Sequence, residues 1–175
     1  MNFDEITISP LLESDIPTVL EIEYDSQPEP WNEKAFIEET NRANSKLLVA
    51  RVSTGASCDA LSHAGQLSEQ ARDSEIVAGY ICFWSIEDEI QILNLAVRKS
   101  LRRRGIARKL IELAIQTGSN RHARFVTLEV RKSNLAARKL YESLGFTVVG
   151  ERPDYYGVQK ESAILMELEI RDFSA

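Results

Sequence analysis

The chain has 175 residues, a formal net charge of −6 at pH 7 and 43% hydrophobic residues, which is ordinary for a globular protein. This length predicts one domain over residues 1–175, with a substantial core. No apolar run is long enough to span a bilayer, and residues 1–5 are acidic, unlike a signal peptide. We therefore expect a cytoplasmic protein, a monomer or weak dimer, that binds neither membrane nor nucleic acid directly.

The first part of the chain alternates strand-like and helix-like patterns. The expected elements are a strand over 4–9, a helix capped by Ser14 or Asp15, a loop over 27–30, a helix over 32–41 and a strand over 46–52. The two prolines of the loop cannot continue a helix. Asn32 is a suitable cap for the second helix, because its side-chain oxygen can accept a hydrogen bond from the first turn.

Residues 53–74 differ from both flanks. They are rich in Ser, Ala, Gly and Gln and show little apolar periodicity. Because strand-like runs precede and follow them, we predict a flexible insert in the domain that is not needed for chemistry, with a short helix over 61–72 as an option.

The second part of the chain is expected to continue the same sheet. Its predicted elements are strands over 75–84 and 89–97, a helix over 104–117 ended by Gly118, a strand over 123–130, a helix from Asn134 to Gly145, and paired strands over 146–150 and 162–170. A turn over 152–157 is expected to join the last two strands. Hairpins combined with strand–helix–strand units predict an α/β fold on a mixed sheet.

The run 101–108 (LRRRGIAR) follows an apolar strand and opens an amphipathic helix. The first N–H groups of a helix lack intrahelical acceptors, and the helix dipole adds positive charge there. Gly105 would let the backbone approach an anion closely, while Ala107 keeps the next contact small. Arginine side chains at a helix start often form only a solvated face, but their positive charge there is unfavourable to the helix dipole. The pattern therefore favours a phosphate-binding turn.

Two further residues are candidates for chemistry. Glu129 lies on a core strand whose opposite face is apolar, so its carboxylate must be paired or wet. It is either functional or a strand-end charge paired with Arg131 or Arg98. Tyr141 lies on the inward face of a helix, where a tyrosine is usually part of the core. We expect three aromatic residues either to line a pocket or to anchor loops, namely Trp31, Tyr155 and Tyr156.

Several common sites are not indicated. The turn lacks the second glycine and the Lys-Ser/Thr pair of a Walker A loop, and it is not a dinucleotide fingerprint. His63 and His122 have no partners at ligand spacing, so we expect no metal. Cys58 and Cys82 are expected to be ordinary thiols, with Cys82 made inert by an apolar strand.

The sequence resembles the GNAT superfamily of acetyl-coenzyme A-dependent N-acetyltransferases, and within it the RimI-like ribosomal-protein-alanine enzymes. Arg102, Gly105 and Ala107 match the family's pyrophosphate loop of Gln or Arg, two residues, Gly, one residue, and Gly or Ala. The resemblance covers most of the chain outside 53–74. Similar segments are PWNEK at 30–34, NLAV at 94–97, LEVR at 128–131, SN at 133–134, LYESLGF at 140–146 and YY at 155–156.

The resemblance implies a GNAT-type fold, with a mixed, mostly antiparallel sheet flanked by helices on both faces, and roles for individual residues. Glu129 would be the general base and Tyr141 the general acid. Trp31, Tyr155 and Tyr156 would flank the acceptor. Contacts with acetyl-coenzyme A would come from Leu95, Ala96, Val97, Arg103, Arg104, Gly105, Ile106, Ala107, Arg108 and Asn134.

The resemblance also implies a reaction, namely acetyl transfer to a protein N-terminus, most specifically the N-terminal alanine of ribosomal protein S18. An α-amine has a pKa near 8, so a carboxylate can deprotonate it at small cost. Two alternatives stay open at this point. One is acetylation of a small amine or of other protein N-termini, and the other is a non-catalytic coenzyme A-binding regulatory module.

Overall fold

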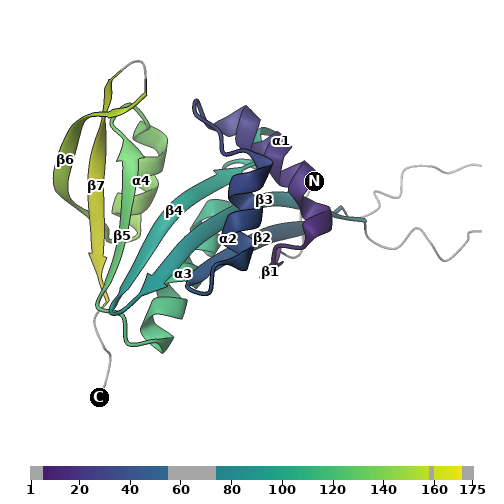
Figure 1. Cartoon of the computed structure of the whole chain (residues 1–175), viewed down its shortest axis with the longest axis horizontal. Helices are drawn as coiled ribbons and strands as arrows, with labels where there is room; N and C mark the ends of the chain where they lie inside the picture. Colours follow the sequence, from purple (N-terminus) through teal and green to yellow (C-terminus); the bar gives the residue numbers. More distant parts are fainter. Residues whose placement is uncertain (1–5, 55–73, 158–159, 171–175) are drawn as a thin grey trace, which may run out of the picture.

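The computed structural model describes residues 6–54, 74–157 and 160–170. The described part contains seven strands and four α-helices (Figure 1). Their order is β1 (Ile6–Pro10), α1 (Ile16–Ser26), α2 (Glu33–Asn41), β2 (Ser45–Thr54), β3 (Ser74–Ile86), β4 (Glu89–Val97), α3 (Ile106–Asn120), β5 (Phe125–Arg131), α4 (Leu135–Ser143), β6 (Thr147–Tyr156) and β7 (Glu161–Glu169). Short 3-10 helices, Glu13–Asp15 and Lys99–Leu101, precede α1 and follow β4.

The strands form one sheet in the order β1-β2-β3-β4-β5-β7-β6. The β4–β5 pair is parallel, and the other five pairs are antiparallel. The parallel register covers only Glu89–Ile92 against Phe125–Leu128. Beyond it the two strands diverge, so that the sheet opens like a V between β4 and β5 (Figure 1). The predicted mixed, mostly antiparallel sheet is confirmed.

Helices cover both faces of the sheet, as the sequence predicts. On one face α1 and α2 pack on β2–β4, with Val19, Phe36 and Tyr80 fully buried in that layer. On the other face α3 and α4 pack on β3–β5 and β7, with Leu110 and Met166 at its centre. Each helix presents apolar residues at helical spacing to the sheet, and burial of this surface is the main source of stability.

Local signals placed several element ends correctly. The Asn32 side chain caps α2 by accepting from the Ala35 N–H at 3.0 Å, and Asn134 caps α4 through the Ala137 N–H at 3.2 Å. Gly145 follows α4 with φ of 96°, a conformation that glycine adopts easily. These three positions are confirmed because each cap depends on its own turn of the chain.

The predicted helix over 104–117 is shifted. α3 begins at Ile106 and continues to Asn120, so Gly118 is not its stop signal. A Cβ at Gly118 would lie 2.8 Å from Ile170 Cδ1 and 2.9 Å from Ile90 Cγ1. Gly118 therefore lets α3 approach the sheet closely, a tertiary requirement that its sequence neighbours do not reveal.

The predicted turn over 152–157 is wrong for most of its length, because β6 continues through Tyr156. The β6–β7 register shifts twice, between Val148 and Gly150 and between Arg152 and Tyr156. These irregularities re-aim the side chains at the end of β6. Most of the predicted insert, with its optional helix over 61–72, lies outside the described residues.

Candidate active site

The divergence of β4 from β5 leaves one edge of β4 without a strand partner. Leu95, Ala96 and Val97 lie on this stretch, and on its other side Gly79 of β3 pairs with Val97 and Tyr80 with Ala96. This edge therefore has no strand partner and can bond an extended ligand, although the side chains of Arg102 and Gln27 donate to the Val97 and Leu95 carbonyls. The structure places the three predicted pantetheine contacts along this edge.

The turn before α3 has the geometry of an anion site. Gly105 is the N-cap with φ of 81°, and Arg103 also has positive φ, 65°. The first helical hydrogen bond runs from the Lys109 N–H to the Gly105 carbonyl at 3.0 Å. The N–H groups of the three intervening residues, 106–108, thus precede the helical ladder and fit a bound pyrophosphate.

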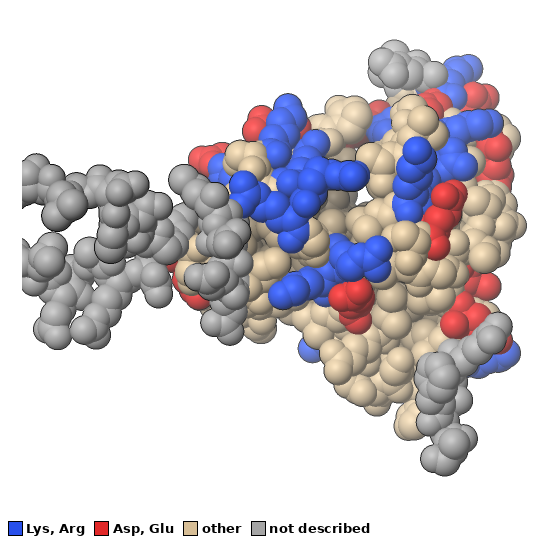
Figure 2. Space-filling view, turned by 180° about the vertical axis from the view of Figure 1, so that it is seen from behind, with Lys and Arg blue, Asp and Glu red and all other residues tan. Residues whose placement is uncertain are grey.

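The arginine side chains of this region are exposed or half-buried, and two of them, Arg102 and Arg108, fix the turn and α3 to neighbouring elements. Arg102 donates to the Val97 carbonyl at 3.0 Å and to Ser26 Oγ at 3.0 Å, and so fixes the turn to the end of β4. Arg108 donates to Ser143 Oγ at 2.7 Å and joins α3 to α4. Arg103 and Arg104 are exposed. Lys and Arg gather on the face that carries α3 (Figure 2), although the protein is acidic overall.

Glu129 lies on β5 where β4 has already diverged. Its Oε1 is 2.8 Å from Arg152 Nη1, and its side chain is 21% exposed. Arg131 and Arg98, the partners considered from sequence, bind elsewhere: Arg131 pairs with two other carboxylates, and Arg98 with one. The carboxylate is therefore both paired with a guanidinium and partly exposed to water, which offsets the cost of placing it on a core strand.

Two tyrosines, Tyr155 and Tyr156, lie near this carboxylate, and a third, Tyr141, lies near Tyr156. The hydrogen bond of Tyr155 with Glu129 raises the pKa of the Tyr155 hydroxyl. Burial, reinforced by the charge of Glu129, raises the pKa of Tyr156 to about 12. Burial and the nearby Tyr156 raise the pKa of Tyr141 above its ordinary value. All three hydroxyls are thus protonated at neutral pH, and the structure brings Glu129, Tyr141, Tyr155 and Tyr156 together.

A second cluster connects the α1–α2 loop to β6 and β7. Arg131 reaches Glu29 at 3.1 Å and Glu161 at 3.3 Å, while its guanidinium stacks 4.1 Å from the centre of the Tyr156 ring. The Glu29 carboxylate also lies against Gly157. The loop that contains Trp31 therefore sits beside the end of β6, as an acceptor channel between them would need.

Glu23, a fully buried carboxylate on α1, is not among the predicted site residues. Its Oε1 accepts from the Trp31 N–H at 2.8 Å and from Asn94 Nδ2 at 3.0 Å. Its Oε2 accepts a short hydrogen bond from the Tyr80 hydroxyl, whose pKa is raised by burial and by Glu23. A signal was available, because Glu23 falls seven residues after Ile16, on the apolar stripe of α1.

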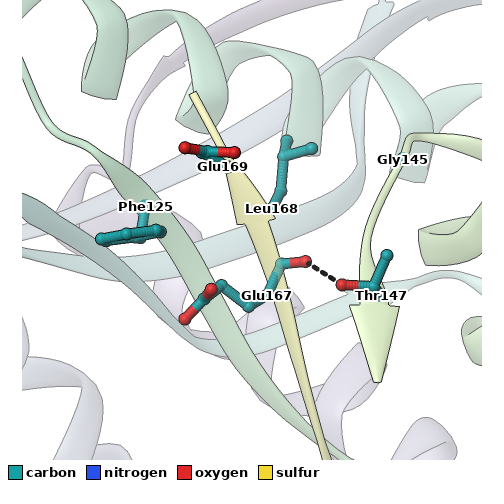
Figure 3. A pocket seen from close by; sticks show the side chains of 6 residues that line it. All are labelled: Phe125, Gly145, Thr147, Glu167, Leu168 and Glu169. Atoms are coloured by element: carbon teal, nitrogen blue, oxygen red, sulfur yellow. Dashed lines mark hydrogen bonds between the residues drawn. The ribbon is translucent and has the colours of Figure 1, made fainter. Parts of the chain in front are cut away.

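Other features do not belong to this site. A pocket lined by Phe125, Gly145, Thr147, Glu167, Leu168 and Glu169 (Figure 3) contains no predicted site residue and lies where β5 begins. Cys82 is buried, which raises its pKa to about 12. In residues 6–54, 74–157 and 160–170 no three His, Cys, Asp or Glu side chains could hold a metal together. No helix in these ranges is long and apolar enough to cross a membrane.

The GNAT acetyltransferase family model matches residues 16–146. The chain belongs to the GNAT acetyltransferase family. It is 32% identical over 168 residues to the ribosomal protein bS18-alanine N-acetyltransferase of Escherichia coli K12, covering 94% of this chain and 97% of that protein. The enzyme of the same name from Haemophilus ducreyi is 30% identical over 164 residues, covering 92% and 98%.

Solved structures agree with this assignment. The crystal structure of the ribosomal-protein-S18-alanine N-acetyltransferase from Escherichia coli superposes with a TM-score of 0.73 at 28% identity, covering 98% of this chain and 99% of that one. The GNAT-type fold expected from sequence is thereby confirmed. The chain is an N-acetyltransferase that takes its acetyl group from acetyl-coenzyme A.

Proposed function

We propose that this GNAT enzyme acetylates the N-terminal α-amine of a protein, and that its substrate is the N-terminal alanine of ribosomal protein S18. The observation that supports this acceptor most directly is the 32% identity, over 94% of the chain, to an enzyme named for that reaction. The site is compatible with it, because Glu129 lies just beyond the point where β4 and β5 diverge, and Arg131, which stacks on Tyr156, also binds Glu29 of the Trp31 loop.

In the proposed mechanism, the backbone at 95–97 and the turn at 103–108 hold acetyl-coenzyme A, and Asn134 contacts it from the start of α4. When bound, it supplies the activated acetyl thioester. Trp31, Tyr155 and Tyr156 flank the acceptor. Glu129 removes a proton from the α-ammonium, directly or through water, and the neutral amine attacks the thioester carbonyl. When the C–S bond breaks, Tyr141 gives a proton to the departing thiolate, and the second proton of the attacking nitrogen returns to Tyr141 through solvent.

The acidity of the acceptor makes a carboxylate base adequate. An α-amine with a pKa near 8 costs only about 1 kcal/mol to deprotonate at neutral pH, whereas a lysine side chain costs roughly 4–5 kcal/mol. Because the tyrosine pKa values are raised, Tyr141 keeps its proton until the thiolate forms. Cys82 is not needed as a nucleophile, and its raised pKa keeps it protonated.

The test is acetylation of synthetic peptides that begin with the S18 N-terminus, followed by mass spectrometry. We expect addition of one acetyl group at the α-amine of an N-terminal alanine peptide. A matched peptide with a blocked α-amine and a free lysine is the control. Preferential acetylation of the lysine or of small amines, or acetyl-coenzyme A binding without any transfer, would contradict the proposal.

A further inference from the structure

The carboxylate of Glu23 is an unusual choice at its position. It is fully buried on the face of α1 that packs against the sheet. Its three hydrogen bonds come from neutral donors, namely the Trp31 N–H, Asn94 Nδ2 and the Tyr80 hydroxyl. A buried carboxylate is costly unless its hydrogen bonds are satisfied, and an apolar side chain would fill the same position without that cost.

Two hydrogen-bond partners of Glu23 lie on different sides of the proposed site, one at the acceptor and one at the acetyl donor. Trp31 belongs to the loop proposed to hold the acceptor, and its N–H is bound directly by the carboxylate. Asn94 immediately precedes the strand edge at 95–97 that is proposed to hold the acetyl donor. One carboxylate oxygen, Oε1, accepts from both, at 2.8 and 3.0 Å. It therefore fixes the distance between loop and strand.

Neighbouring contacts repeat the connection. Gln27 Nε2 donates to Asn94 Oδ1 at 3.0 Å and lies 3.4 Å from the Leu95 carbonyl. The Trp31 ring packs on Phe36 with 5.5 Å between ring centres, and Phe36 packs edge-on against Tyr80 at 5.4 Å. The Trp31 loop, α1, α2 and β3–β4 are thus connected by hydrogen bonds and ring contacts. Glu23 accepts hydrogen bonds from the loop, from β3 and from β4.

We infer that Glu23 is a positioning residue that holds the acceptor loop in register with the acetyl-donor strand. The inference rests on the proposed function, because that function assigns the loop to the acceptor and the strand to the donor. Reacting atoms must approach to about 3–3.5 Å in line, so a small shift of the loop lowers the rate steeply. We expect donor affinity to change little, because the α3 turn, which is proposed to hold the pyrophosphate, makes no hydrogen bond with Glu23 among those of the described residues.

The experiment compares Glu23→Gln with Glu39→Gln. Glu39 is also a buried carboxylate on the same face, 8% exposed, and accepts from Trp84 Nε1 at 2.6 Å and Arg42 Nε at 3.2 Å, but touches neither the loop nor β4 through these bonds. For Glu23→Gln we expect kcat/KM for the alanine peptide to fall about tenfold or more, with acetyl-coenzyme A Kd within about threefold. For Glu39→Gln both constants stay near wild type.

Hydrogen exchange of the Trp31 amide gives a readout that needs no acetyl acceptor. We expect slow exchange in wild type and Glu39→Gln, and exchange about tenfold faster in Glu23→Gln. If wild type acetylates no N-terminal peptide, the proposed function fails, and this exchange rate alone decides whether Glu23 holds the loop. Unchanged exchange in Glu23→Gln would overturn the inference.

Two kinetic outcomes would also overturn it. One is an unchanged peptide kcat/KM in Glu23→Gln, with only a lower melting temperature. The other is an equal loss of peptide kcat/KM and donor affinity, which would indicate general distortion. If Glu23→Gln does not fold, Gln27→Ala replaces it, since Gln27 is only half-buried. We then expect an acceptor-specific loss of about threefold or more, and no loss would overturn the inference.

Discussion

The guanidinium of Arg152 lies 2.8 Å from the carboxylate of Glu129, although β7 separates their strands in the sheet. Arg152 precedes a shift in the β6–β7 register, which lets its side chain cross toward β5. With 54% of its side chain exposed, Arg152 can move aside when a cationic amine approaches. The ion pair holds the Glu129 carboxylate at the open end of the sheet.

Replacement of Glu129 by Gln removes the proposed base but keeps its volume. We expect turnover to fall about 10²–10⁴-fold at neutral pH. Acetyl-coenzyme A affinity remains near wild type, because Glu129 lies away from the α3 turn. Glu151→Gln is the control, since Glu151 forms an exposed pair with Lys132 at 2.9 Å. Unchanged turnover in Glu129→Gln would remove this carboxylate from the mechanism.

Replacement of Tyr141 by Phe tests the proposed acid. The Tyr141 hydroxyl has no hydrogen bond within the described residues, so its loss should change the free energy of unfolding by less than about 1 kcal/mol. We expect turnover to fall about 10²-fold, because the thiolate then leaves without its proton. Tyr24→Phe, at a 59% exposed tyrosine of α1, is the control. Equal turnover in both variants would refute the role.

The anion turn allows backbone and side-chain contributions to be separated. Gly105→Ala places a side chain at φ of 81°, which costs about 1–2 kcal/mol and shifts the turn. We expect it to weaken acetyl-coenzyme A binding more than the double change Arg103→Gln and Arg104→Gln does. The double variant instead shows a weaker dependence of Kd on salt. Calorimetric titration at two salt concentrations measures both, and the reverse ranking would favour side-chain recognition.

Alkaline stability depends on groups with raised pKa values. Burial raises the pKa of the Cys82 thiol in the folded protein to about 12, above the 9.0 of an unburied thiol, so the unfolded chain loses this proton first. Its contribution to stability is complete below pH 9 and is lost as pH rises toward 12. We expect Cys82→Ala to flatten the fall in the free energy of unfolding over this window by up to about 1.4 kcal/mol per pH unit. An identical slope in urea titrations would contradict this.

The predicted insert can be tested by shortening the β2–β3 connection. Thr54 and Ser74 are register partners, so a two-residue Asn-Gly turn in place of residues 55–73 can close the hairpin. A shorter loop costs less closure entropy, and we expect the free energy of unfolding to stay constant or rise by about 1 kcal/mol. Donor Kd should also be unchanged. Loss of the folded state would show that these residues support the fold.

The features that depend only on neighbouring residues could be predicted from the sequence. The caps at Asn32 and Asn134 and the end of α4 at Gly145 follow from local backbone chemistry. The alternation of β5 likewise predicted that Glu129 shares its face with Thr127, and both are partly exposed in the structure. The family resemblance placed the acetyl donor, and the confirmed fold is consistent with that placement.

Sequence could not predict what depends on contacts between distant segments. The local pattern predicts a helix stop at Gly118, whereas packing against Ile90 and Ile170 is what requires this glycine. The pattern predicts a turn at the end of β6, because the pairing of β6 with β7 is not visible locally. Neither the pairing of Arg152 with Glu129 nor the buried position of Glu23 follows from neighbouring residues. Both lie at the proposed site, where function can override local pattern.

The sheet is continuous across β4 and β5 for only four register pairs. The two parts of the sheet, β1–β4 and β5–β7, are therefore joined by this short run of strand pairing and by the core that they share with α3 and α4. An extended ligand that contains amide groups and binds along the divergence would act as an additional strand between them. Such a ligand would connect the two parts of the sheet. Their relative motion, and the stability of the short β4–β5 pairing against unfolding, would then report on donor occupancy.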